Sequence, residues 1–442
     1  MCRFAAIVFV VVSGFVLILH GPVEGRDDQP NKSPLKFAAF IEHVKNASYD
    51  EIKKVEGFKV ESKAAFDEMR AFLANRYRDF PVKHTFLSKL GHAIDCVPID
   101  KQPALQHKLL AGHQVQLTPT PPPDAKPKDD NKGPGAVEPA QMFLGKGEKD
   151  SEGNEMAAPD GTIPIRRVTL HDLVRFRTLK DFLRKDTFGG GLPTEKPAAA
   201  DPHRYAVGFQ NVGNIGGTSW LNIWDPLPTT NEFSLSQVWY VAGSPVQTIE
   251  CGWQVYPQKY GHSKPVLFIY WTADGYNQTG NYNLDAPAFV QTNNSFVLGG
   301  AWNTISTTNG TQFGFQVSWF HDPGNHNWWL WLQGAGANTP IGYYPSTLFG
   351  TGPMATAAAT CEFGGEVTGT ASGQMGSGAF ASTGFGKAAF QRNIAYYASP
   401  TSAVGVGLGA IQPDPSCYTI DIHDNSGTNW GSYFFFGGPK CP

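Results

Sequence analysis

Ile249-Glu250-Cys251-Gly252-Trp253-Gln254-Val255 is one of two stretches on which the interpretation of this sequence depends, and Cys361-Glu362-Phe363-Gly364-Gly365-Glu366-Val367 is the other. Each places a carboxylate among apolar, glycine and aromatic residues, and the chain after residue 203 has only four glutamates: Glu232, Glu250, Glu362 and Glu366. An ionised carboxylate in apolar surroundings is costly unless it is paired or neutralised. Two carboxyls that face each other have pKa values pushed apart, which supplies an acid and a base in one site. We therefore predict that Glu250 and Glu366 form a catalytic pair.

The chain around these stretches has the pattern of an all-β protein. All eleven tryptophans follow residue 203, and no amphipathic helix is evident there. Clusters of Gly, Asn, Pro and Asp separate short apolar runs at 218–224, 233–241, 248–256, 266–272, 288–291, 314–320, 328–333 and 341–344. Many short strands with such turn signals predict an antiparallel β-sandwich, and ~240 residues suit one large sandwich.

The spacing of the cysteines suggests how they are arranged. Successive side chains of a strand point to opposite faces, so Cys251 should face away from Glu250, and Cys361 away from Glu366. If the two stretches are neighbouring strands, Cys251 and Cys361 form a disulfide on one face while the carboxylates meet on the other. Cys417 and Cys441 would then close a C-terminal hairpin.

The N-terminus has the pattern of a secretory signal. Residues 1–25 begin Met-Cys-Arg, continue as an apolar run to residue 19, and end in small residues. The alternative, a membrane anchor, is disfavoured because the run is short and no second spanning run follows. We therefore expect a secreted protein, in the extracellular space, the cell wall or the vacuole. Four sequons fit an exported chain, at Asn46, Asn277, Asn293 and Asn309.

Composition divides the rest of the chain. A charged, mixed α+β propeptide domain is expected first, with an amphipathic helix between Val55 and Phe80 and a short strand and turn within 92–105. A proline-rich stretch reads as an extended linker, and a second Gly/Pro/Ala linker as a protease-sensitive one. The expected boundaries are 1–25, 26–116, 117–160, 161–202 and 203–442 for signal peptide, activation domain, linker, propeptide end with cleavable linker, and sandwich.

Several motifs together resemble the neprosin family of plant secreted proteins. They appear in that family's order and cover nearly everything after the signal peptide: Asp95-Cys-Val-Pro-Ile-Asp-Lys-Gln-Pro-Ala, Ile163-Pro-Ile-Arg-Arg, Phe233-Ser-Leu-Ser-Gln-Val-Trp, Ile249-Glu-Cys-Gly-Trp-Gln-Val, Phe268-Ile-Tyr-Trp-Thr-Ala-Asp, Phe363-Gly-Gly-Glu-Val, Gln374-Met-Gly-Ser-Gly, Gly384-Phe-Gly-Lys-Ala and Trp430-Gly-Ser-Tyr-Phe-Phe-Phe-Gly-Gly-Pro. One departure stands out: Asn281-Tyr-Asn-Leu-Asp-Ala lacks the cysteines that the family usually has there.

The resemblance implies an activity. It implies a monomeric, metal-free glutamic endopeptidase, made as a zymogen that its own propeptide inhibits, working at acid pH and cleaving proline-containing proteins or peptides after proline. The family's catalytic glutamates fall on Glu250 and Glu366. Glu366 is preferred to Glu362 because the family pattern fixes the glutamate of Gly-Gly-Glu.

Peptide hydrolysis needs an activated water, a proton donor and oxyanion stabilisation. One ionised glutamate and one protonated glutamate supply the first two, and the sequence leaves open which is which. Gln254 shares the strand face of Glu250 and is expected to help hold the oxyanion. Trp329 and Trp331 share one face of another strand, and lining the cleft or packing in the core are equally open for them.

Other features leave fewer possibilities. The basic stretch from Arg166 to Lys185 is either a solvated helix face, capped by Thr169, or a propeptide segment that covers the acidic cleft and weakens on acidification. The net charge of −3 argues against nucleic-acid binding, and the twelve histidines show no metal-ligand spacing, so no cofactor is expected. Two alternative functions remain: a glycoside hydrolase, which also uses paired glutamates, and a non-catalytic carbohydrate- or wall-binding module.

Overall fold

The computed structural model describes residues 36–127, 129–142, 147–185, 203–369 and 373–441. The predicted signal peptide and residues 186–202 of the predicted cleavable linker lie outside the described residues. Below, the N-terminal part means the described residues from 36 to 185, and the C-terminal part those from 203 to 441. No helix among the described residues is both long enough and apolar enough to cross a membrane.

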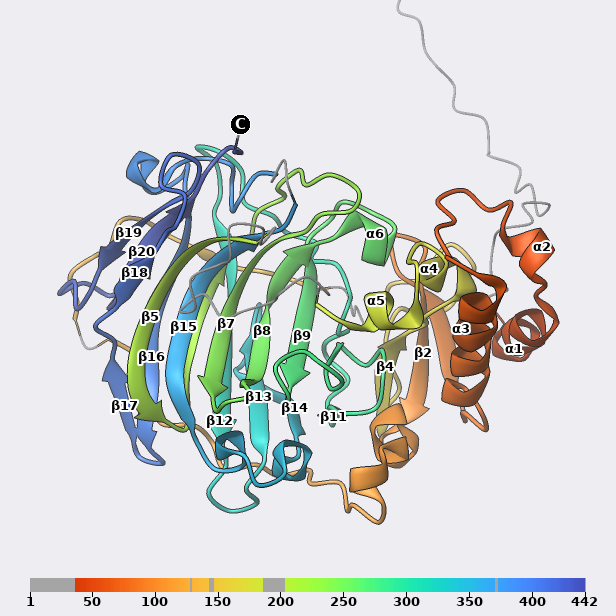
Figure 1. Cartoon of the computed structure of the whole chain (residues 1–442). Coiled ribbons are helices and arrows are strands. Elements are labelled where there is room, and N and C mark those ends of the chain that lie inside the picture. The colour runs from red at the N-terminus through yellow and green to blue at the C-terminus, as the bar shows by residue number, and fades with distance from the viewer. Residues whose placement is uncertain (1–35, 128, 143–146, 186–202, 370–372, 442) are drawn as a thin grey trace, which may run out of the picture. The chain divides into compact units, whose positions relative to one another are not determined.

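The C-terminal part is an antiparallel β-sandwich, as predicted (Figure 1). Its first sheet has seven strands in the order β10-β9-β8-β7-β15-β5-β18. These are β5 (Arg204–Asn214), β7 (Ser234–Ala242), β8 (Gln247–Val255), β9 (Val266–Thr272), β10 (Asn281–Tyr282), β15 (Ala358–Val367) and β18 (Gly409–Ile411). One short helix, α6 (Pro257–Tyr260), follows β8.

The second sheet has ten strands, with the order β11-β14-β13-β12-β6-β16-β20-β19 and two additions at β16 and β12. Its strands are β6 (Gly216–Asn222), β11 (Val290–Gln291), β12 (Phe313–His321), β13 (Trp328–Gln333), β14 (Thr339–Tyr344), β16 (Ala389–Ser399), β17 (Ser402–Gly405), β19 (Thr419–His423) and β20 (Tyr433–Gly437), joined by β3 (Glu138–Pro139) from the N-terminal part. The addition of β3 to β12 is parallel, and the other pairings of this sheet are antiparallel.

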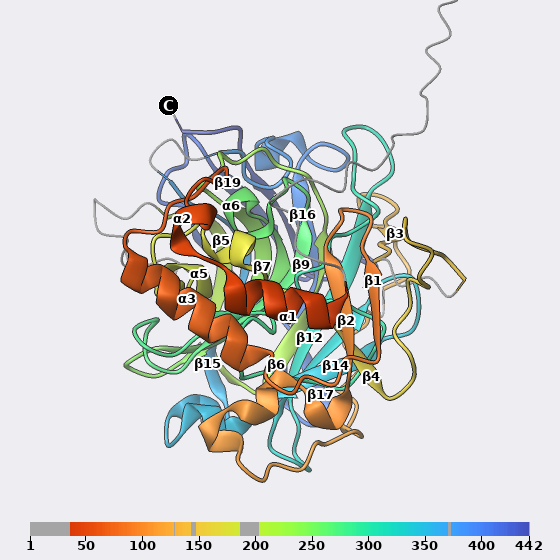
Figure 2. The ribbon, with the colours of Figure 1, turned by 90° about the vertical axis from the view of Figure 1, so that its right-hand side faces the viewer.

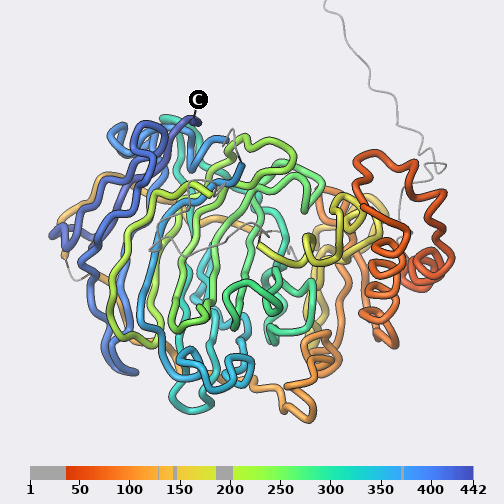
Figure 3. Tube along the Cα trace, in the orientation of Figure 1, coloured from red at the N-terminus to blue at the C-terminus, as the bar shows by residue number. Residues whose placement is uncertain are grey.

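Alternation along the strands decides which side chains fill the sandwich. On β8, Ile249, Cys251 and Trp253 are fully buried in the core between the sheets. The Trp253 indole donates to the carbonyl of Asn222 on β6, 2.8 Å away, so the two sheets are in direct contact. Residues at the alternate positions face the outer side of the seven-stranded sheet. Figure 3 follows these neighbouring strands as a trace.

The N-terminal part combines helices with a small sheet, as the α+β prediction stated. Its helices are α1 (Phe37–Asn46), α2 (Tyr49–Ile52), α3 (Lys63–Arg76), α4 (Leu170–Leu173) and α5 (Leu179–Leu183). Its antiparallel sheet has the order β1-β2-β4, from β1 (His84–Leu87), β2 (Ala93–Pro98) and β4 (Thr162–Arg166). Helices α1 and α3 lie against each other (Figure 2) through aromatic contacts such as that of Phe37 with Tyr77.

Two predicted helices are shorter in the structure. The helix expected from Val55 begins only at Lys63, because Gly57 adopts a left-handed turn and Ser62 caps the amide of Ala65. Thr169 caps a helix as predicted, in a capping box, but that helix ends at Leu173. Thr178 then caps a second one, because its side chain accepts the amide of Asp181.

The described portion of the segment predicted as an extended linker runs along the ten-stranded sheet. The Thr120 amide and hydroxyl donate to the carboxylate of Asp322, at 2.5 and 3.0 Å. Further along, the Trp430 indole donates to the carbonyl of Gly135, 3.1 Å away. The segment is therefore held to the C-terminal part at several points.

Candidate active site

The two predicted catalytic glutamates lie on the same face of the seven-stranded sheet. Glu250 is on β8 and Glu366 on β15, and both point to the outer side, where they are buried at 0% and 2% exposure. Strand β7 lies between them, pairing Trp239 with Glu250 and Leu235 with Glu366. The prediction that both share a face is confirmed, but their strands are not neighbours.

This strand order excludes the predicted disulfide between Cys251 and Cys361. Both thiols point into the core, as the spacing predicted, and both are free. Because β7 separates their strands, two strand spacings of ~4.8 Å lie between them, beyond the ~4.4–6.8 Å that a disulfide allows between Cα atoms. Cys96 is also free and buried.

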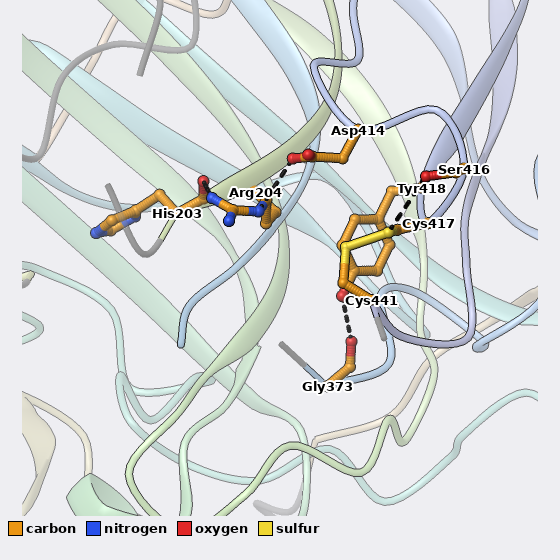
Figure 4. Close-up of a disulfide and its surroundings, with 8 residues drawn as sticks. All are labelled: His203, Arg204, Gly373, Asp414, Ser416, Cys417, Tyr418 and Cys441. Carbon is orange, nitrogen blue, oxygen red and sulfur yellow. Dashed lines mark hydrogen bonds and ion pairs between the residues drawn. A yellow bond between two sulfur atoms is a disulfide. The ribbon is translucent and has the colours of Figure 1, made fainter. Parts of the chain in front are cut away.

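The other predicted disulfide is confirmed. Cys417 and Cys441 are bonded, with Cα atoms 4.9 Å apart (Figure 4). Beside it, the hydroxyl of Tyr418 donates to the carbonyl of Gly373 at 2.7 Å. The nearby ion pair between Arg204 and Asp414, 3.0 Å long, joins the start of β5 to this corner of the molecule.

Three neutral donors hold the carboxyl of Glu250. The Gln237 side-chain amide donates to Oε2 at 2.9 Å, and the hydroxyls of Thr248 and Tyr276 donate to Oε1 at 3.0 and 2.8 Å. Burial raises the pKa of Tyr276 well above its usual value, so this phenol remains protonated and can donate. The carboxyl is therefore fixed in one orientation on the floor of the site.

Glu366 has a different neighbour. The Nδ1 atom of His203 lies 2.5 Å from its Oε1 atom, and the imidazole is 1% exposed. The ring stacks on Tyr205 at 6.1 Å and meets Phe233 edge-on at 6.0 Å. His203 comes directly before β5, so the packing of that strand fixes the histidine beside Glu366.

A lysine from the N-terminal part joins the two glutamates. Lys185 Nζ lies 2.7 Å from Oε2 of Glu250 and 2.9 Å from Oε2 of Glu366, and the side chain is 4% exposed. Its ammonium also lies over the ring of Trp239, 5.3 Å from the centroid. One cation therefore occupies the space between the two carboxyls.

The electrostatics of this arrangement are consistent with the geometry. Burial acts to raise the pKa of Glu366, but the charge of Lys185 and the contact with His203 outweigh it and hold that pKa below its usual value. Burial acts to lower the pKa of Lys185, but the two glutamates outweigh it and raise that pKa. At neutral pH the structure therefore holds Glu366 as an ionised carboxylate beside a lysine cation.

Glycines flank the strand that lies between the two glutamates. Gln237, in the middle of β7, is paired with Gly252 on one side and Gly364 on the other, so neither neighbour carries a side chain. The Oε1 atom of Gln237 is buried and has no hydrogen-bond partner among the described residues. A peptide backbone approaches a sheet closely where glycines flank it, which fits a floor for an extended substrate.

The predicted substrate-binding residues fare differently. Gln254 lies on the face of Glu250, as predicted, and its side-chain amide donates to the hydroxyl of Tyr282 at 3.4 Å. It is paired with Leu235, the residue that also pairs with Glu366, so Gln254 lies across β7 from that carboxyl. Its role with the oxyanion stays a prediction.

The prediction that Trp329 and Trp331 line the cleft is wrong. They share a face, but on β13 of the ten-stranded sheet, where they pack against Tyr343 and against Ala104 and Leu110 of the N-terminal part. The aromatic surroundings of the glutamates come instead from the outer face of the seven-stranded sheet, whose cluster includes Tyr205, Trp239, Phe268, Tyr270 and Tyr282.

Three contributors to the site were missed from the sequence: His203, Gln237 and Tyr276. Of these, Gln237 had a usable signal, because it lies at alternating spacing inside a strand motif that carries the family resemblance. Lys185 ends the basic stretch for which a cover over the cleft was one of two open interpretations. Of the sequons, Asn46, Asn277 and Asn309 are exposed and Asn293 is partly exposed, and glycosylation stays a prediction. No group of three or more His, Cys, Asp or Glu able to hold a metal occurs within the described part of the chain.

Comparison with known proteins places this site in a family. Two solved structures are similar at low level: scytalido-glutamic peptidase with a peptide-based transition-state analogue (9% identity, TM-score 0.28) and SCP-B, a member of the Eqolisin family of peptidases, with the tripeptide Ala-Ile-His (9% identity, TM-score 0.27). Each alignment covers 54% of this chain and 98% of the other. The Neprosin family model matches residues 230–439, and the Neprosin activation peptide model matches residues 85–209. The chain therefore belongs to the neprosin family, with an activation peptide ahead of its neprosin domain.

Proposed function

We propose that this chain is the zymogen of a secreted glutamic endopeptidase, in which Glu250 and Glu366 hydrolyse peptide bonds at acid pH. The observation that carries the proposal is the lysine of the activation peptide bound between two buried carboxyls on the outer face of the seven-stranded sheet. A site built only for stability would have no reason to receive its counter-charge from a segment of an activation peptide. Secretion, with a destination outside the cell or in the vacuole, is part of the same proposal and rests on the N-terminal sequence.

The chemistry follows from what Lys185 occupies. When it leaves, the space between Glu250 and Glu366 is free for a water molecule and a scissile carbonyl. The ionised glutamate takes a proton from the water molecule while the water oxygen attacks the carbonyl carbon of the substrate. The protonated glutamate then gives its proton to the nitrogen of the leaving amine. Gln237 and Tyr276, which donate to Glu250 in the zymogen, are placed to stabilise the developing oxyanion.

Latency and acid activation follow from the sign of one pKa shift. The pKa of Glu366 is depressed while Lys185 is bound, so this contact stabilises the zymogen above the usual carboxyl pKa and is lost as the pH falls through the lowered value. The pKa of Lys185 is raised, so the lysine keeps its charge throughout. Acid therefore removes the carboxylate charge and leaves a buried ammonium without its partner, which favours release.

The preference for proline is proposed on the family resemblance and on the aromatic surroundings of the dyad. Trp239 and Tyr270 lie on the same outer face as the glutamates. A proline ring is apolar and rigid, so it packs well against aromatic faces. No described contact selects the position of the proline relative to the cut.

The test is a maturation and cleavage assay. The precursor is secreted, held at about pH 3–5, near carboxyl pKa values, and followed by mass spectrometry with a proline-containing peptide, beside Glu250→Gln and Glu366→Gln. Glu362→Gln is the matched control, because Glu362 is equally buried on the same face of β15. We expect wild type and control to shed the activation peptide and cut, and the two dyad variants to stay folded and silent. Equal inertness of all four chains on peptides would refute the proposal, and polysaccharide cleavage would then favour the glycosidase alternative.

A further inference from the structure

The segment 281–286, where the chain departs from the family's cysteine pattern, carries a buried ion pair. Lys259, at the end of α6, lies 2.9 Å from Asp285 through Nζ and Oδ2, and the two side chains are 0% and 6% exposed. The backbone carbonyl of Asp285 accepts from Arg76 of the N-terminal part at 2.9 Å. Lysine is almost never fully buried unless it is paired, so the burial of Lys259 depends on its partners.

The activation peptide places one aromatic residue on this ion pair. Lys259 Nζ donates to the carbonyl of Phe182 at 2.9 Å and lies 3.8 Å from the centroid of its ring. The same ammonium lies 4.6 Å from the centroid of Tyr282. Phe182 is fully buried there, three residues before the lysine that binds the dyad.

Removal of the activation peptide changes what Lys259 can bind. Its ammonium keeps the ion pair with Asp285 but loses its contacts with the carbonyl and the ring of Phe182. Because a lysine ammonium has three N–H donors, at least one of them then lacks its former acceptor. A buried donor left without a partner is unfavourable by about 1–3 kcal/mol. The matured domain therefore presents a cation directed at the place where a peptide carbonyl and an aromatic ring had been.

We propose that Lys259, Asp285 and Tyr282 form a substrate subsite for an aromatic side chain, which Phe182 occupies in the zymogen. The inference rests on the proposed function, and it adds a specificity element at some distance from the scissile bond. Lys259 supplies a carbonyl contact and a cation–π contact, Asp285 keeps its ammonium in place, and Tyr282 forms the apolar wall.

The site is rigid without its occupant. Tyr282 meets Tyr270 edge-on at 4.9 Å and Phe268 at 6.1 Å, and all three belong to the neprosin domain. An aromatic side chain gains from the cation as well as from the wall, whereas an aliphatic one gains only from the wall. The subsite should therefore rank Phe and Tyr above Leu, and Leu above Ala.

The experiment uses the matured enzyme and a peptide set in which each position around one scissile bond is in turn Phe, Leu or Ala. We expect Phe to exceed Ala by about tenfold in kcat/KM at a single position. Lys259→Met keeps the apolar stem and removes the charge, so it should bring the Phe/Leu ratio close to one, while the lost carbonyl contact lowers kcat/KM for the Phe, Leu and Ala peptides alike. Lys264→Met is the matched control, because Lys264 pairs with Asp225 away from the subsite, at 2.6 Å.

A second measurement avoids any folding defect of the Lys259 variant. A synthetic peptide of residues 178–185 is tested as an inhibitor of the wild-type matured enzyme, beside the same peptide with Phe182→Ala. Both retain Lys185, so both can reach the dyad, and we expect the substituted peptide to inhibit about tenfold more weakly.

The outcomes separate the two proposals. An enzyme that cuts peptides but shows the same Phe/Leu ratio with and without Lys259, or is inhibited equally by both peptides, overturns the subsite and leaves the dyad intact. A wild-type enzyme that cuts no peptide overturns the proposed function itself.

Discussion

Two neighbouring imidazoles form part of the contact between the activation peptide and the neprosin domain. His92 lies in the turn between β1 and β2, His262 follows α6, and their ring centroids are 5.1 Å apart. Burial, then the charge of Arg166, lowers the pKa of His92 to about 3 and that of His262 to about 4. Arg175 lowers both further, while Asp172 opposes these effects.

The sign of these shifts makes the contact sensitive to acid. A histidine whose pKa is lowered by docking stabilises the docked state above the free value of about 6.5, and that stability is lost as the pH falls. At pH 4 the lowered pKa values of His92 and His262 together correspond to a free energy of about 6 kcal/mol that opposes docking of the activation peptide. Both rings are partly exposed, so solvent screening reduces this to roughly 3 kcal/mol for the pair.

Replacing both histidines by phenylalanine keeps a contact between two rings and removes the titration. We expect the His92→Phe, His262→Phe precursor to hold its activation peptide at lower pH, with the midpoint of maturation displaced by roughly one pH unit. The assay is the rate of conversion of precursor to matured enzyme between pH 3 and 7, read on gels. His423→Phe is the matched control, since His423 is partly exposed and stacks on Tyr433 outside this contact.

A separate measurement assigns the effect to release and not to chemistry. Once matured, the double variant should have the peptide-cleavage pH profile of wild type, because neither histidine contacts the dyad among the described interactions. An unchanged or higher midpoint of maturation in the double variant would refute the reasoning, whatever the activity of the matured enzyme.

Three further predictions concern the site and its sheet. His203→Asn keeps a donor but removes the cation beside Glu366, so the acid limb of kcat/KM in the matured enzyme should move up by about one pH unit; an unmoved limb contradicts this. Gly252→Ala places a Cβ 1.9 Å from a backbone oxygen of β7, so urea unfolding should show a loss of about 2–3 kcal/mol, whereas Gly213→Ala, with nothing within 4 Å, should be neutral. Maturation must discard the lysine at the dyad and keep the histidine, so N-terminal sequencing of matured enzyme should begin within residues 186–203; a start beyond 203 counts against the role of His203.

Strand periodicity made part of the site predictable. Alternation alone placed Glu250 and Glu366 on one face and Cys251 and Cys361 on the other, and the structure agrees. The order of the strands has no comparable local signal, because it depends on pairings between segments more than a hundred residues apart. Strand β7 lies between β8 and β15, and this one unpredicted fact overturned the disulfide.

The same limit explains the tryptophans. Their shared face on β13 was predicted correctly, but a sandwich has two outer faces, and alternation does not say which sheet a strand joins. Both outer faces carry aromatic side chains here, and the activation peptide contacts both: Leu110 packs near Trp329 on one, and Lys185 lies over Trp239 on the other. An apolar outer face was therefore no guide to the cleft.

Residues that act across a domain contact were the least predictable. The basic stretch ending at Lys185 was left open between a solvated face and a cleft cover, because charge in sequence does not reveal its partner. His203 lies one residue before a strand, where nothing in the local pattern distinguishes it from a loop histidine. The role of each residue depends on its contact with a glutamate far away in the sequence: Lys185 contacts Glu250, and His203 contacts Glu366.

The structure connects latency with catalysis through the same charges. Two carboxyls buried together on an apolar face are unstable unless their charge is compensated, and in the zymogen Lys185 provides the compensation from within the activation peptide. Acid makes that compensation unnecessary, because a protonated glutamate needs no counter-charge. On the proposal above, the fall in pH that weakens the contact between Glu366 and Lys185 also supplies a protonated carboxyl as the donor for peptide cleavage. On that proposal, a single fall in pH both weakens the contact of Lys185 with the dyad and sets the protonation state of the dyad.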